Sequence, residues 1–133
     1  MICEQNSFLQ TIFSSGKSLT AIGMAILYDK GLFKYEDTIA KYWPEFAQNG
    51  KENVRICDVL RHESGLAYFK EDSPSLDDMT TANIKLNKVG EIIEKEELHF
   101  PDYKDSDSKR QYHSVSKGLI LNEVIRRIHP QVK

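Results

Sequence analysis

Cysteine is scarce in this chain of 133 residues, which contains only Cys3 and Cys57. Two cysteines cannot build the disulfide framework that holds small secreted domains together, so we expect both to be reduced thiols. A surplus of charge of one sign is also missing, since the formal net charge is −2. A nearly neutral chain has no basic surface for nucleic acid or for an anionic membrane, and we predict neither partner.

Long apolar runs and metal-binding patterns are absent as well. No stretch approaches the roughly 20 apolar residues that a membrane-spanning helix needs. The chain has Glu4 where a signal peptide carries positive charge, which leaves the compartment open with the cytoplasm as the default. His99 and His129 have no metal-ligand spacing with the cysteines, so we predict no metal and no other cofactor.

The sequence does contain helical periodicity, in a chain long enough for one domain. The first predicted helix is apolar on nearly every side, which indicates a helix buried all round. Gly31 is placed to end it, and Trp43 and Phe46 are predicted core residues. At most two or three weak strand candidates are found. Helices are predicted over residues 17–30, 38–42, 54–61, 84–97 and 116–128.

Ser14 and Lys17 stand three residues apart at the start of the first predicted helix. Residues at this spacing share a helix face. A serine hydroxyl becomes a good nucleophile only with a base in hydrogen-bond reach. A lysine in apolar surroundings loses affinity for its proton, because burial disfavours the charged form. Ser14 and Lys17 therefore form a candidate nucleophile and base, and the backbone N–H of Ser14 could face an oxyanion.

The spacing alone does not decide the function, because serine precedes lysine by three residues at two other places. These are Ser106 with Lys109 and Ser114 with Lys117. A structural interpretation is also open for Ser14, since serine is a favoured N-cap residue. Only the pair at positions 14 and 17 runs straight into a long apolar helix, and that context favours it.

The order of these segments resembles the serine β-lactamase-related family, which includes class C β-lactamases, penicillin-binding proteins and esterase-like relatives. Residues 14–17 look like the family's nucleophile motif, and residues 29–32 with 39–46 look like the segment after its nucleophile helix. Residues 56–66, which contain His62 and Ser64-Gly65-Leu66, are similar to its most specific segment. Residues 112–114 stand where the family has a Tyr-x-Asn motif before a helix, and residues 119–128 continue the likeness.

This resemblance implies a two-step acyl transfer on a small-molecule or peptide substrate. Ser14 would attack a carbonyl carbon, and Lys17 and Tyr112 would carry its proton. His113 and Ser114 would contact the substrate. Ser114 replaces the family's asparagine, and a hydroxyl lacks the two-ended hydrogen bonding of an amide. His62 is interpreted as a residue that packs or caps at a helix end.

The resemblance also implies an α+β parent fold of the β-lactamase/transpeptidase type, of which residues 1–133 would be a partial domain. The family closes its site with a strand bearing a Lys-Thr-Gly or His-x-Gly triplet, and neither triplet follows Tyr112. The chain is therefore expected to be mainly α-helical, to lack most of the sheet, and to be inactive or nearly inactive by itself.

Two other functions remain open from the sequence. Gly16-Lys17-Ser18 matches the end of a phosphate-binding loop, although Thr11 stands where that loop has its first glycine. The second alternative is a non-catalytic relative or fragment that serves as a binding or scaffold piece.

Overall fold

The computed structural model of the chain describes residues 11–70, 72–99 and 110–129. The only β-type pairing among these residues is an isolated antiparallel bridge between Thr38 and Arg55. The described part is otherwise helical, as the sequence predicted. It contains the α-helices α1 (Lys17–Asp29), α2 (Ile56–Leu60), α3 (Thr81–Lys85), α4 (Lys88–Lys95) and α5 (Ser116–Ile128), and the 3-10 helices η1 (Phe13–Gly16), η2 (Ile39–Lys41) and η3 (Pro44–Ala47).

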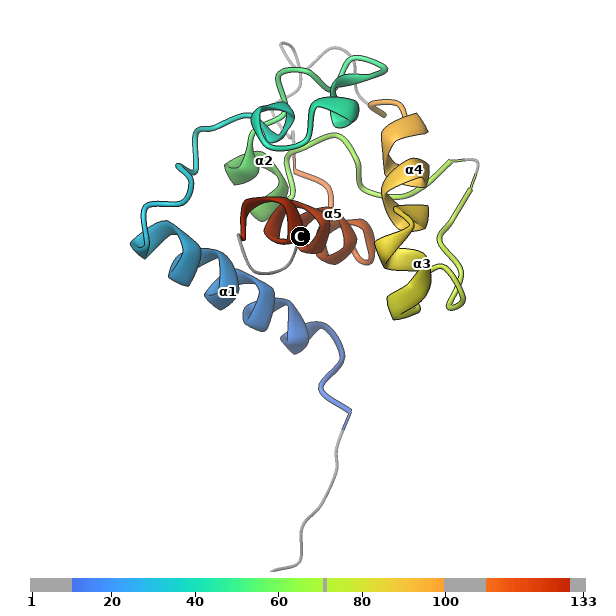
Figure 1. Cartoon of the computed structure of the whole chain (residues 1–133), viewed down its shortest axis with the longest axis horizontal. Helices are drawn as coiled ribbons and strands as arrows, with labels where there is room; N and C mark the ends of the chain where they lie inside the picture. Colours follow the sequence, from blue (N-terminus) through green and yellow to red (C-terminus); the bar gives the residue numbers. More distant parts are fainter. Residues whose placement is uncertain (1–10, 71, 100–109, 130–133) are drawn as a thin grey trace, which may run out of the picture.

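Helix α5 occupies the centre of this arrangement and packs against α1, α2 and α4 (Figure 1). Its bounds agree with the predicted helix, because Ile120, Leu121 and Val124 recur at helical spacing and are fully buried. At its first residue, the Ser116 hydroxyl donates to the carbonyl oxygen of Leu66 at 2.6 Å. This hydrogen bond ties the first residue of α5 to the segment that follows α2.

Helix α1 is much less buried than its sequence predicted. Met24 and Leu27 are its buried residues, and they face α5. Leu19, Ile22 and Ile26 are 65%, 56% and 51% exposed. The prediction of burial on every side was wrong, because the described residues cover α1 on one side, and Figure 1 shows it at the edge of the fold. Gly31 ends the helix region with a φ of +70°, as predicted.

The single helix predicted over residues 84–97 is in fact two helices. The break falls at Asn87, which has a left-handed backbone with a φ of 63°. Its side-chain oxygen accepts hydrogen bonds from Arg126 at 3.1 Å and Arg127 at 2.8 Å. A Cβ on Gly90 would lie 2.1 Å from that oxygen, so glycine leaves the room for it. The hydrogen bonds from α5 to Asn87 therefore stabilise a break that the helical periodicity of residues 84–97 did not predict.

Trp43 and Phe46 lie in the core, as predicted, and both are fully buried. The indole Nε1 of Trp43 donates to Glu94 Oε1 at 2.8 Å. The guanidinium of Arg127 lies 3.9 Å from the centre of the indole ring, a distance at which a cation and an aromatic face attract each other. One side chain thus connects the segment around η3 with α4 and α5.

Lys51 is a buried cation at the C-terminal end of α4. Its side chain is fully buried, and its Nζ donates to the backbone oxygens of Glu94, at 3.0 Å, and of Glu96. A cation is favourable at the negative end of a helix dipole. Burial nevertheless lowers the pKa of Lys51 to about 8, and the charges of the nearby glutamates offset this only in part.

Two matched substitutions on α1 test its one-sided burial. Met24→Ala should lower the free energy of unfolding by roughly 2–5 kcal/mol, because it opens a cavity in the core. Ile22→Ala, on the exposed side, should change it by less than about 0.5 kcal/mol. Urea unfolding followed by circular dichroism measures both, and equal losses would contradict the one-sided packing.

The buried amine of Lys51 predicts a pH dependence of stability. Its pKa is about 8 in the folded chain and has the ordinary value of 10.5 in the unfolded chain. The unfolded state therefore binds more protons between these pH values, and this group makes the chain more stable as pH rises through that window. Urea unfolding from pH 7.5 to 10 should show this rise in the parent relative to Lys51→Met. Parallel curves would refute it.

Candidate active site

The side chains of Ser14, Lys17 and Tyr112 meet at the start of α1. The Tyr112 hydroxyl donates to Ser14 Oγ at 2.7 Å, and Lys17 Nζ donates to the same oxygen at 3.3 Å. Ser14 lies in η1, which runs without interruption into α1, so the three-residue spacing puts Lys17 beside it. The structure thus brings together three residues that the resemblance had grouped across most of the chain.

Tyr112 reaches Ser14 because the short segment before α5 is tied to the turn after α2. The backbone N–H of Gln111 donates to the carbonyl oxygen of His62 at 3.0 Å. The backbone N–H of His113 donates to Nδ1 of the same histidine at 2.9 Å. The His62 and Tyr112 rings also pack together, with centroids 5.0 Å apart. Sequence reasoning gave His62 a packing role, and only the fold reveals that its partner is Tyr112.

Hydrogen bonding lowers the pKa of Tyr112. The Ser14 hydroxyl, which can also donate to the phenolate, has the largest effect, and a hydrogen bond from Lys17 follows. Burial acts against these hydrogen bonds, and the positive charges of Lys17 and Lys117 lower the pKa further by smaller amounts. The phenol is thereby better suited to accept a proton than an ordinary tyrosine, whose pKa is about 10.

The apolar surroundings predicted for Lys17 are not found, because its side chain is partly exposed. This correction follows from the exposed sides of α1, which leave the amine next to solvent. Ser14 is exposed and its hydroxyl oxygen accepts no capping hydrogen bond, since neither η1 nor α1 has a side-chain N-cap. The N-cap interpretation of Ser14 was therefore wrong. The helical turn of η1 also leaves no open loop ahead of Lys17 to surround a phosphate.

His113 does not lie where a substrate contact requires it. Its side chain is 1% exposed. Its Nε2 lies 2.7 Å from Ser64 Oγ and its Nδ1 lies 2.5 Å from the Gln111 carbonyl oxygen. The expected role of His113 in substrate binding is thus not supported, because this ring holds two chain segments together inside the protein. Ser114 is exposed in the bend that leads into α5.

The other serine–lysine pairs differ from the first. Lys117 is 8% exposed, and its Nζ donates to the Leu60 carbonyl oxygen at 2.9 Å. That amine also lies 3.4 Å from His62 Nε2, so it faces the back of the Tyr112 site rather than Ser114. Ser106 and Lys109 lie outside the described residues, as does Cys3. Cys57 is a buried free thiol, as predicted.

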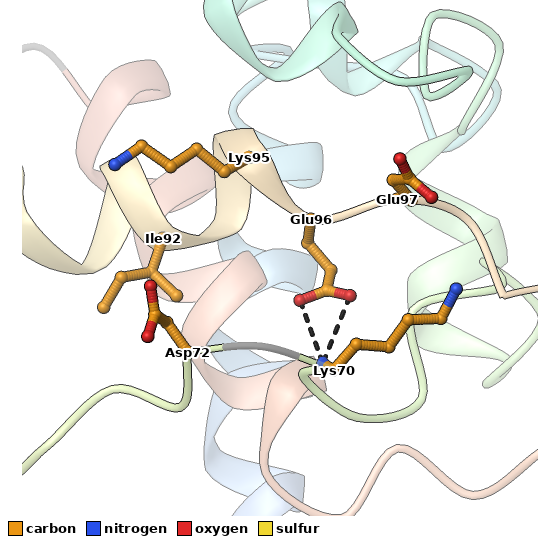
Figure 2. A pocket seen from close by; sticks show the side chains of 6 residues that line it. All are labelled: Lys70, Asp72, Ile92, Lys95, Glu96 and Glu97. Carbon is orange, nitrogen blue, oxygen red and sulfur yellow. Dashed lines mark hydrogen bonds between the residues drawn. The ribbon is translucent and has the colours of Figure 1, made fainter.

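A cleft of about 110 Å³ lies beside the C-terminal end of α4 and is shown in Figure 2. Ligand pockets usually measure roughly 300–1,000 Å³, so this cleft is too small for a typical ligand. The carboxylate of Glu96 accepts the backbone N–H of Lys70 across it. It contains none of the candidate catalytic residues. Its walls are formed by Lys70, Asp72, Ile92, Lys95, Glu96 and Glu97.

The part of the chain that the structure describes contains neither a metal-binding cluster nor a membrane-spanning helix. No group of three or more His, Cys, Asp or Glu side chains there is arranged to hold a metal ion. None of the described helices has the length and apolar character needed to cross a membrane.

The sequence model of the Beta-lactamase family matches residues 8–131. The chain belongs to this family. The esterase/beta-lactamase LipL of Mycobacterium tuberculosis is 45% identical over 59 residues, which are 44% of this chain and 14% of that protein. Penicillin-binding protein 4* of Bacillus subtilis is 35% identical over 66 residues, which are 50% of this chain and 14% of that protein.

Solved structures of the Beta-lactamase family have the same helical arrangement. A family VIII carboxylesterase matches with a TM-score of 0.74 and 28% identity, over 91% of this chain and 30% of that chain. A penicillin-binding protein homologue from Caulobacter crescentus matches with a TM-score of 0.70 and 30% identity, over 87% of this chain and 29% of that chain. The described residues therefore form a helical part of the β-lactamase/transpeptidase fold, and the chain spans less than a third of these two solved structures.

Replacing Ser14 by alanine should raise the pKa of Tyr112 toward the ordinary value of about 10, because the strongest hydrogen bond to the phenolate is lost. The measurement is the tyrosinate absorbance of the Ser14→Ala chain as a function of pH. Subtracting the curve of the Ser14→Ala, Tyr112→Phe double variant leaves the titration of Tyr112. Ser15→Ala removes a neighbouring exposed hydroxyl and is the control. An unchanged titration in Ser14→Ala would show that the contact does not form in solution.

Proposed function

We propose that this part of the Beta-lactamase family member carries a serine acyl-transfer centre, with Ser14 as the nucleophile and Lys17 and Tyr112 as proton carriers. The observation that carries the proposal is the pair of hydrogen bonds on Ser14 Oγ, from Tyr112 at 2.7 Å and from Lys17 at 3.3 Å. Both distances are within or near the reach that proton transfer to a base requires.

The proposed reaction begins when the Tyr112 phenol has given up its proton and forms an ion pair with the Lys17 ammonium. The resulting phenolate takes the proton of Ser14, whose oxygen then bonds to the carbonyl carbon of the substrate. The proton passes from Tyr112 to the leaving group as its bond to the acyl carbon breaks. Water then attacks the acyl-serine and gives one proton to the Tyr112 phenolate. Tyr112 passes that proton to Ser14 Oγ as its bond to the acyl carbon breaks, which releases the acid and restores the Ser14 hydroxyl.

The oxyanion formed in this reaction needs hydrogen-bond donors. Within the described residues, the candidate donor is the backbone N–H of Ser14, which belongs to the first turn of η1, where N–H groups lack partners inside the helix. One donor is fewer than efficient acyl transfer uses. We therefore propose that the 133-residue chain alone reacts slowly with acyl substrates, and that full activity needs groups beyond those described.

The substrate class follows from the reaction type and from the relatives. Solved and curated relatives are called an esterase/beta-lactamase, a carboxylesterase and a penicillin-binding protein homologue. Esters, amides and lactams are all attacked at a carbonyl carbon, and we propose one of these as the substrate. Ser114 is exposed and stands two residues after Tyr112, and we propose that it contacts the substrate.

Covalent labelling with a fluorophosphonate probe tests the nucleophile. We expect slow, substoichiometric labelling of the pure chain, with the adduct on the peptide that contains Ser14. Ser14→Ala should abolish it. Lys17→Met and Tyr112→Phe should slow it by about 10²–10⁴-fold, the usual contribution of a general acid or base. Intact mass and peptide mapping measure the label.

Ser15→Ala is the matched control, because it removes the adjacent hydroxyl and should keep the labelling rate. Labelling of Ser15, or a folded chain that is never labelled at Ser14, would contradict the proposed nucleophile and favour a non-catalytic role. Rapid stoichiometric labelling of Ser14 would support the nucleophile and contradict the proposed incompleteness of the isolated chain.

A further inference from the structure

His62 holds the Tyr112 segment through three separate contacts. Its backbone is left-handed, with a φ of 64°, which is uncommon for a residue with a side chain. Its carbonyl oxygen accepts the N–H of Gln111, its Nδ1 accepts the N–H of His113, and its ring packs against the ring of Tyr112. One residue therefore contacts Tyr112 and both of its neighbours in the chain.

The orientation of the His62 ring is set at Nδ1. Nδ1 accepts a backbone N–H, so the hydrogen of the neutral ring is on Nε2. Nε2 lies 3.4 Å from Lys117 Nζ, but an ammonium offers no acceptor for the Nε2 hydrogen, and this amine donates instead to the Leu60 carbonyl oxygen. The ring cannot rotate without losing the hydrogen bond at Nδ1.

Tyr112 needs such support because burial does not hold it. Its side chain is 53% exposed, while its hydroxyl lies 2.7 Å from Ser14 Oγ. An exposed tyrosine otherwise samples several rotamers. A displacement of about 1 Å can reduce a catalytic rate about 10²-fold.

We propose that His62 is the positioning residue that holds the Tyr112 phenol in reach of Ser14. The proposal deepens the acyl-transfer function above and rests on it for its catalytic meaning, but the placement of Tyr112 can be measured without any activity.

The charged and titratable groups around Tyr112 come from three elements. Lys17 faces it from α1, Lys117 from α5, and His62 from the turn after α2. Burial, followed by the positive charge of Lys117, lowers the pKa of His62 to about 4, so the ring is uncharged near pH 7. Replacing His62 by a neutral residue therefore changes no charge at that pH, and its effect on Tyr112 reports position.

The test is the titration of Tyr112 by NMR of chains with ¹³Cζ-labelled tyrosine, with the signal assigned by Tyr112→Phe. His62→Asn is the main variant, since asparagine tolerates a left-handed backbone and offers an acceptor but no ring. The pKa of Tyr112 should rise toward about 10, because the phenol loses its bonds to Ser14 and Lys17. His62→Asn should also slow fluorophosphonate labelling of Ser14 at least about 10-fold.

His129→Asn is the matched control. His129 follows α5 at its far end, about 18 Å from Lys117 along the helix axis, and its replacement should leave the Tyr112 titration unchanged. An unchanged titration in folded His62→Asn overturns the proposal. Loss of the helical circular dichroism signal in His62→Asn overturns it too, because the residue would then serve the fold. A shifted titration in a chain never labelled at Ser14 supports the positioning role and refutes the nucleophile.

Discussion

The buried face of α5 is the constraint on which the candidate site depends. Ile120, Leu121 and Val124 are fully buried, and this face packs against α1, α2 and α4. Tyr112 lies just before α5, and Ser14 lies just before α1, so the packing of these two helices brings together residues separated by most of the chain. The apolar contacts supply the energy of this approach, and the hydrogen bonds of Tyr112 and Lys17 to Ser14 set its final geometry.

The site is built at a partly open edge of this core. Helix α1 is buried on the side of Met24 and Leu27 and exposes Leu19, Ile22 and Ile26. The same openness leaves Ser14 exposed and Lys17 partly exposed, so hydrogen bonding rather than burial tunes Tyr112. In this Beta-lactamase family member, the two residues proposed to carry the proton, Lys17 and Tyr112, are thus arranged by contacts within the helical part, and both are partly exposed to solvent.

Local sequence signals predicted much of the fold. The periodicity of residues 116–128 gave α5 with its bounds, Gly31 marked the end of the first helix region, and Trp43 was placed in the core. Each of these depends on the residue itself or on near neighbours. The break at Asn87 could not be predicted in this way, because the hydrogen bonds that stabilise it come from Arg126 and Arg127 on α5. The buried position of His113 likewise depends on the distant Ser64.

The sequence by itself determined the first and last helices, the three-residue spacing of Ser14 and Lys17, and the family motifs around His62 and Tyr112. It could do so because helix periodicity and short motifs are local properties of the chain. Only the tertiary structure decided which side of α1 is buried, that His113 points inward, and that His62 and Lys117 stand behind Tyr112. These outcomes depend on which surfaces meet, and a residue's own neighbours in sequence do not specify that.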